Sequence, residues 1–234
     1  MISFHKQKLA AALVILSLPG MAWIQEASSA ESIRTQEINE CRSSEILTWG
    51  DGKDRPAANS ILKFVYNPTG APDWFPPDMV SKMVIRSVAA WSKCGVNTEI
   101  APWSPNIELK KGVVVVQWHE KESRGNFGLA DFARQTLSLG PKAFELLRTR
   151  NPAHDSGETL QMVISHEMGH LFGLMAHSRH CIDVLSYYHN GKGDSCLSRD
   201  PLWKSRVAEY RNTLPTACDI ERCRKANGKP PLSP

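Results

Sequence analysis

The sequence predicts an α+β fold built as one domain. Segments with strand and helix patterns follow one another in the order strand, helix, several strands, helix, irregular segment, helix. The segment VVVVQW (113–118) is continuously apolar, as in a strand buried on both faces. A long helical pattern from about Asp155 carries a dense group of histidines. We divide the chain into a signal peptide, a polar lead-in, the domain proper and a basic, proline-containing tail, at residues 1–30, 31–60, 61–215 and 216–234.

The first thirty residues have the layout of a secretory signal peptide. Lys6 and Lys8 precede the apolar run LAAALVILSL (9–18), and small residues precede a cleavage site after Ala30. The run is shorter than the about 20 residues that span a bilayer. We therefore expect cleavage near Ala30, a secreted or periplasmic protein, and no stable insertion into a membrane.

Charge and size narrow the class of partner. The chain has 28 lysines and arginines against 24 acidic residues, a formal net charge of +4, and the basic residues are spread along it. This balance is too mild to indicate nucleic-acid binding. The length after the signal peptide suits one domain with a substantial core, and we expect a monomer.

Six cysteines follow the signal peptide, and an even number in an exported chain predicts disulfides. Six cysteines allow 15 pairings, and the sequence alone does not choose among them. Pairing of near neighbours would join Cys181 to Cys196, Cys218 to Cys223 and Cys41 to Cys94. No CxxC pair occurs, which disfavours a zinc site made of cysteines.

Three further segments have strand patterns. ILKFVY (61–66) alternates and ends in the turn NPTGAP, and VNTEI (96–100) is a short strand. RQTLSL (134–139) mixes polar and apolar residues, which is typical of an edge strand. The lead-in, 31–60, is polar and turn-rich and has no regular pattern.

The first long helix is expected from Pro76 to about Cys94, where Gly95 can end it. Its apolar positions follow helical spacing: Val80, Met83, Val84, Val88 and Trp91. A third, C-terminal helix is expected from Pro201 to about Arg211, with Asp200 as its N-cap. The tail after Cys218 is expected to be disordered.

The second long helix begins at a predicted capping box of Asp155 and Glu158. It carries His166 and His170, whose side chains leave one face about 6 Å apart, so that two imidazoles can share one zinc ion. Glu167 lies beside the first ligand and can take a proton from a zinc-bound water, whose pKa zinc lowers to about 7. Two histidines at this spacing can also form a solvated helix face. The mid-helix position and the further histidines after a glycine favour a metal site.

The segment HEMGHLFGLMAHS (166–178) resembles the zinc-binding signature HExxHxxGxxH of the metzincin peptidases, and within them the matrixin-like branch. The resemblance implies the zinc ligands His166, His170 and His177 and the general base Glu167. It also implies a turn at Gly173, where a left-handed backbone returns the chain to the metal. It covers about residues 60–190 and implies a zincin-like catalytic domain, with a twisted mixed sheet packed on two long helices.

The sequence departs from that signature at two places. Three residues separate Gly173 from His177, where the family has two. His177 then reaches the metal through a bulged turn, or His180 replaces it, with Asp183 as a remaining possibility. Leu185 in DVLSYY (183–188) stands where the family has a methionine below the metal, and we expect this to be tolerated because the volumes are similar. The departures also leave room for an inactive relative.

Two weaker interpretations concern other side chains. Tyr187 falls where related branches place a tyrosine near the zinc, so the resemblance implies that it can stabilise an oxyanion; a packed aromatic is the alternative. Asp51, Asp54 and Asp131 could bind calcium, but no recognisable loop pattern supports this.

The leading hypothesis is an exported zinc-dependent endopeptidase, whose peptide substrate binds as an added strand along Arg134 to Leu139. A catalytically inactive binding protein on the same scaffold is one alternative. Glu167 disfavours it, because a binding scaffold does not need a base there. A zinc hydrolase acting on a non-peptide amide is the other alternative, and the sequence does not separate it from a peptidase.

Overall fold

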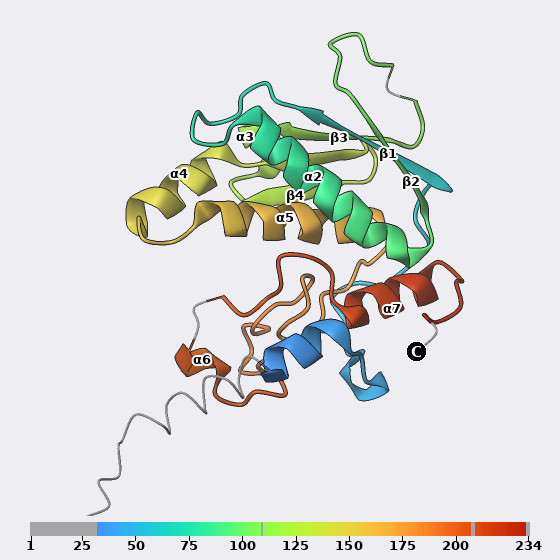
Figure 1. The fold of residues 1–234 in the computed structure, drawn as a ribbon, viewed down its shortest axis with the longest axis vertical. Coiled ribbons are helices and arrows are strands. Elements are labelled where there is room, and N and C mark those ends of the chain that lie inside the picture. Colours follow the sequence, from blue (N-terminus) through green and yellow to red (C-terminus); the bar gives the residue numbers. More distant parts are fainter. Residues whose placement is uncertain (1–31, 109, 207–208, 233–234) are drawn as a thin grey trace, which may run out of the picture.

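The structure is a computed structural model and describes residues 32–108, 110–206 and 209–232 (Figure 1). The predicted signal peptide, 1–30, lies outside the described residues. Within the described ranges, no helix has the length and apolar character needed to cross a bilayer.

Five strands form one sheet in the order β2-β1-β3-β5-β4. The strands are β1 (Ile61–Asn67), β2 (Asn97–Ala101), β3 (Val113–Trp118), β4 (Gly128–Asp131) and β5 (Thr136–Leu139). The first four in the order run parallel, and β4 pairs antiparallel with β5. The sheet is therefore mixed, and the predicted α+β class is confirmed.

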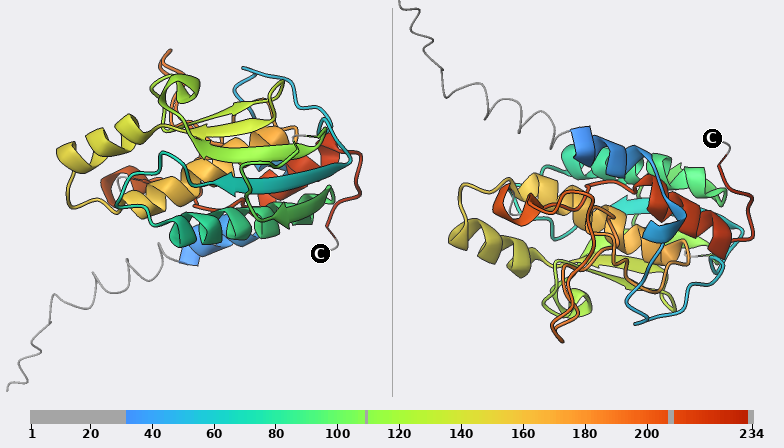
Figure 2. Two further views of the ribbon diagram at one scale, coloured as in Figure 1. Left: turned by 90° about the horizontal axis from the view of Figure 1, so that it is seen from above. Right: turned by 90° about the horizontal axis from the view of Figure 1, so that it is seen from below.

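Two long helices, α2 (Pro77–Trp91) and α5 (Ser156–Leu171), lie side by side against the sheet (Figures 1 and 2). All the apolar positions predicted for α2 are buried. Polar contacts in the core also join the two helices. The hydroxyls of Ser87 and Ser165 are 2.8 Å apart, and Trp91 Nε1 donates to the Ser165 carbonyl at 2.9 Å. These contacts fix the position of α5, which carries the candidate site.

Both long helices end close to the predicted residues. A short 3₁₀ turn, η2 (Ser92–Cys94), extends α2 to Gly95, which has φ +84°. Asp155 caps α5 by accepting from the Gly157 N–H at 2.8 Å. The predicted reciprocal contact from Glu158 is not part of this cap.

The prediction of an edge strand at 134–139 is wrong. Arg134 and Gln135 belong to a turn, and the strand begins at Thr136 as β5, between β3 and β4. Its polar pattern reflects internal hydrogen bonds: Ser138 is buried, and its hydroxyl donates to Glu122 at 3.0 Å. The edge beside β5 is the four-residue strand β4, which the sequence analysis did not identify.

The helices outside α2 and α5 also differ from the prediction. Instead of a helix over 201–211, the structure has α6 (Trp203–Arg206), and 209–210 are not helical. The tail expected to be disordered contains α7 (Ala217–Ala226), which begins at a capping box of Thr216 and Asp219. The described residues contain further helices that were not predicted, at residues 32–39, η1 (Ser43–Glu45), α3 (Glu120–Ser123) and α4 (Pro141–Arg150).

Three disulfides join Cys41 to Cys218, Cys94 to Cys223 and Cys181 to Cys196. Only the last agrees with near-neighbour pairing. Cys218 and Cys223 lie on α7, and each bonds to a different distant segment. The first of these disulfides holds the lead-in against α7 in the half of the molecule away from the sheet (Figure 1). Three disulfides are typical of proteins from oxidising compartments, which agrees with export.

Candidate metal centre

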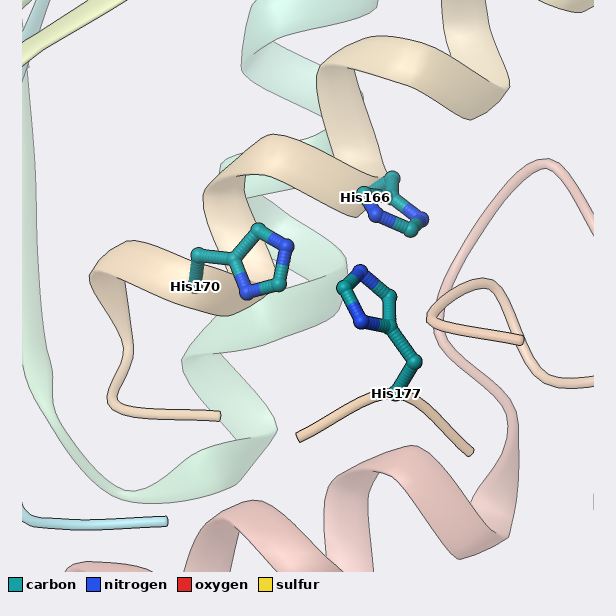
Figure 3. Close-up of side chains that lie close together, drawn as sticks. All are labelled: His166, His170 and His177. Atoms are coloured by element: carbon teal, nitrogen blue, oxygen red, sulfur yellow. The ribbon is translucent and has the colours of Figure 1, made fainter. Parts of the chain in front are cut away.

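Three histidines converge at one end of α5 (Figure 3). His166 and His170 extend from the helix, and His177 comes from the loop that follows Gly173. One nitrogen atom of each ring lies within 4.8 Å of the other two. The structure thus groups His177 with the helix histidines, and neither His180 nor Asp183 belongs to this cluster.

A hydrogen bond holds the Nδ1 atom of each ring. His166 Nδ1 contacts the Val184 carbonyl at 2.8 Å, and His170 Nδ1 contacts the Leu174 carbonyl at 2.6 Å. His177 Nδ1 contacts Asp51 Oδ2 at 2.6 Å. Carbonyl and carboxylate oxygens only accept, so each Nδ1 carries the proton and each Nε2 keeps its lone pair.

The Nε2 atoms have the chemistry of metal ligands. His177 Nε2 is buried and has no hydrogen-bond partner among the described residues. A buried polar atom without a partner is uncommon. Three convergent ring nitrogens, each oriented by a hydrogen bond at its other nitrogen, are the usual arrangement of histidines around a bound metal ion. The cluster could therefore hold a metal.

Burial keeps these rings neutral near pH 7. It lowers the pKa of His166 well below its usual value, and the neighbouring His170 and His177 add to the effect. Burial lowers the pKa of His170 to about 4. It also lowers the pKa of His177, although the Asp51 carboxylate opposes the change. Neutral imidazole is the form that binds a metal ion.

Gly173 turns the chain from α5 toward His177. Its φ is +103°, a left-handed conformation that glycine adopts without steric cost. The lead-in also passes close to it: a Cβ at this position would lie 1.9 Å from the Arg55 carbonyl oxygen. The Arg55 N–H donates to the Gly173 carbonyl at 3.0 Å. Both the backbone conformation and the close approach require glycine.

Gly173→Ala is expected to destabilise the protein far more than Gly193→Ala. Gly193 also has φ +103°, but nothing lies within 4 Å of its Cβ position. Backbone strain alone should cost Gly193→Ala about 1 kcal/mol, whereas the added clash should cost Gly173→Ala about 3 kcal/mol or more. Urea unfolding of both variants with the disulfides intact measures this. Equal losses of unfolding free energy would contradict a clash at Gly173.

Two aspartates of the lead-in hold the turn between Gly173 and His177. Asp54 Oδ1 accepts from the backbone N–H groups of Met175 and Ala176 at 2.9 and 3.1 Å. Asp51 Oδ1 accepts from the backbone N–H of His177 at 2.9 Å. Hydrogen bonds from the lead-in thus fix the backbone of this loop.

The aspartates considered for calcium are engaged separately. Asp51 contacts His177, Asp54 contacts Arg222, and Asp131 contacts Arg134. In the described part of the chain, the three histidines are the cluster of potential ligands, and these aspartates do not gather into a second one.

Glu167 lies between α5 and the edge strand. Its Oε2 atom accepts from the Ala130 N–H of β4 at 2.9 Å. Burial raises its pKa to about 7, and this hydrogen bond opposes the increase. The strand can approach α5 this closely because residue 128 is glycine. A Cβ at that position would lie only 2.9 Å from Glu167 Cγ. A carboxyl with a pKa near neutrality is suited to exchange protons with a reactant.

The histidines and Glu167 line a cleft of about 580 Å³. Residues 125–130, which include part of β4, form one wall. Arg211 and Tyr187 line it as well. The strand beside the cleft is therefore β4, rather than the segment from Arg134 to Leu139.

Tyr187 packs directly against the third histidine. Its ring stacks on His177 with centroids 3.7 Å apart, and the side chain is partly exposed in the cleft. Leu185 is fully buried below α5, where a Cβ on Gly169 would lie 2.8 Å from its Cδ1 atom. Leucine thus fills this position in contact with the helix backbone.

His180 belongs to a buried polar cluster. Its Nδ1 atom lies 3.1 Å from Asp183 and its Nε2 atom 3.2 Å from Glu37. Glu45 lies farther away, at 4.0 Å. Burial alone would lower the pKa of His180, but hydrogen bonds to Asp183 and Glu37 and their negative charges raise it to about 10. His180 is therefore a cation that ties the lead-in to this loop.

The protein is expected to lose stability as the pH rises from 8 to 9.5. The pKa of His180 is higher in the folded protein than in the unfolded chain, so its contribution is complete below about pH 6.5 and is lost toward pH 10. The loss should approach about 1.4 kcal/mol per pH unit. Asp219, with a pKa raised to about 7 by burial and by Asp183, is ionised throughout this window. Urea unfolding at several pH values measures the slope, and His180→Gln should flatten it. A slope retained in His180→Gln would contradict its origin.

Comparisons with known proteins give little further information. No protein-family model matches the sequence, and no curated protein matches it. Among solved structures, the chain is similar to one in the structure titled "GM1 bound form of the ECX AB5 holotoxin". The identity is 14%, the TM-score is 0.47, and the match covers 75% of this chain and 87% of that chain. At this level the likeness supports no conclusion about fold or activity.

Proposed function

We propose that this protein is an exported zinc-dependent endopeptidase of the metzincin type. One observation carries the proposal: three neutral histidines and a buried glutamate with a pKa near 7 meet in a single cleft beside a sheet edge. The histidine spacing and the turn at Gly173 support the metzincin resemblance.

Zinc fits the side chains that are present. His166, His170 and His177 would hold it through their Nε2 atoms, and three protein ligands are typical of catalytic zinc sites. When bound, zinc supplies a Lewis acid that polarises a carbonyl oxygen and makes a water more acidic. The fit rests on the neutral rings and on the partnerless Nε2 atom of His177.

The remaining chemistry belongs to the protein. Among the described residues, β4 pairs with β5 alone and is the last strand in the order, so an extended peptide can add to its other edge. Glu167 lies at the same wall of the cleft, because it accepts a hydrogen bond from Ala130 of β4. It would take a proton from the attacking water and pass it to the leaving amine.

Zinc content and peptide cleavage test the proposal together. The purified exported protein should contain about one zinc per chain and cleave members of a broad library of unstructured peptides. A chelator should abolish cleavage, and zinc should restore it. A zinc-loaded protein that cleaves no peptide would sink the endopeptidase proposal. It would leave a non-peptide amide hydrolase or an inactive binding protein.

A further inference from the structure

His177 is supported differently from the other two histidines. Backbone carbonyls accept from Nδ1 of His166 and His170. For His177 the acceptor is a carboxylate, Asp51, which also accepts from the His177 backbone N–H. One side chain therefore fixes both the backbone and the ring of this residue. A carboxylate that accepts from Nδ1 also makes the Nε2 atom of the same imidazole a stronger metal ligand than a backbone carbonyl in that place would.

Asp51 belongs to residues 49–55, a segment that runs antiparallel to the loop from Gly173 to His177. The Arg55 N–H donates to Gly173, and the Trp49 N–H donates to the His177 carbonyl at 3.0 Å. Between these contacts, a Cβ at Gly52 would lie 2.3 Å from the Met175 carbonyl oxygen, so the two backbones touch. Residues 49–55 therefore pack along the whole turn from Gly173 to His177.

The C-terminal helix α7 holds residues 49–55 in place. Arg222 of α7 donates to both carboxylate oxygens of Asp54, at 2.6 and 3.1 Å, and to the Ala176 carbonyl. Asp54 in turn accepts from the backbone of Met175 and Ala176. Side chains from two distant segments, residues 49–55 and α7, thus hold the turn.

We propose that Asp51 is a positioning residue for the third metal ligand. It sets the Nδ1–H form of His177, directs Nε2 into the cluster and strengthens the nitrogen as a ligand. It compensates for the extra residue between Gly173 and His177. The proposal rests on the proposed metal site, because positioning of a ligand matters only where a metal binds.

Two variants separate charge from hydrogen bonding. Asp51→Asn keeps an oxygen that can accept but removes the charge, whereas Asp51→Ala removes both. Competition with a chromophoric chelator should show zinc binding about 10-fold weaker in Asp51→Asn and about 100-fold weaker in Asp51→Ala. Asp73→Asn is the control, because Asp73 is exposed and distant in sequence from this turn. Zinc affinities of both Asp51 variants within twofold of wild type would overturn the proposal.

A second measurement does not depend on zinc. Nitrogen NMR of the imidazoles in the zinc-free protein at pH 7.5 should show His177 in the Nδ1–H form. That form should be lost in Asp51→Ala, with His166 and His170 unchanged. The same form in wild type and Asp51→Ala would contradict the role of Asp51. If wild type binds no zinc but shows this difference, the proposed function fails while the positioning of the ring stands.

Thermal unfolding of the zinc-free proteins checks the fold of the variants. A purely structural role for Asp51 would lower the zinc-free Tm and leave the zinc affinity of the folded fraction unchanged. A positioning role should lower the affinity in protein that remains folded at the assay temperature. Titrations are therefore compared below the Tm of each variant.

Discussion

Glu167→Gln is expected to lower kcat on the order of 10²- to 10⁴-fold while leaving zinc bound. Glutamine has the shape of glutamate and can still accept from the Ala130 N–H, so the contact between α5 and β4 should stay intact. It cannot take up a proton, which removes the transfer from water to the leaving amine. The ligands are unchanged, so zinc content should match that of wild type.

Two further variants make this result specific. Glu158→Gln places the same substitution on the same helix, at an exposed position in its first turn, and should keep wild-type kcat. His170→Ala should lose both zinc and activity. Zinc per chain and the rate of peptide cleavage are measured for each. Wild-type kcat in Glu167→Gln would show that another group accepts the proton.

Removal of the Cys41–Cys218 disulfide is expected to have the largest effect on stability. It joins residues 177 apart in sequence, but the Cys94–Cys223 disulfide shortens the loop that it closes, so its loss should cost about 4 kcal/mol of unfolding free energy in the chain-entropy description. The Cys181–Cys196 disulfide closes a separation of 15 residues, and its loss should cost about 3 kcal/mol. Urea unfolding of the two paired Cys→Ser variants gives the comparison.

The same variants should differ in zinc binding. Cys41 precedes residues 49–55, which pack along the turn to His177. Cys218 lies in the first turn of α7, the helix that carries Arg222. Loss of this disulfide should therefore weaken zinc binding at temperatures where the protein is still folded. Equal zinc affinities in the folded forms of both paired variants would show that residues 49–55 support His177 without the disulfide.

The sequence predicted the parts of the protein that depend on local patterns. The spacing of one helix places His166, Glu167 and His170, and Gly173 follows just after the end of that helix. Strand β3 has the predicted bounds, because a continuous apolar run has one favourable location, the middle of the sheet.

Other parts depend on contacts that no spacing encodes. Asp51 lies 126 positions before His177, and nothing in the composition of the lead-in indicates that contact. Strand β4 has four residues and one of them is glycine, which leaves little alternation to detect. The helix α7 did have a local signal: Thr216 and Asp219 stand three apart as a capping box. The basic and proline-containing composition after it led to the wrong prediction.

The support for His177 has a consequence for when the protein becomes competent. Its ring is oriented by Asp51, and the neighbouring Asp54 is held by Arg222 of α7, which lies 168 positions later in the sequence. A chain whose helix α7 has not yet been synthesised lacks the contact from Arg222. If the protein binds zinc and cleaves peptides as proposed, its metal centre is complete only after α7 has packed against residues 49–55. Peptide cleavage would then begin late in folding.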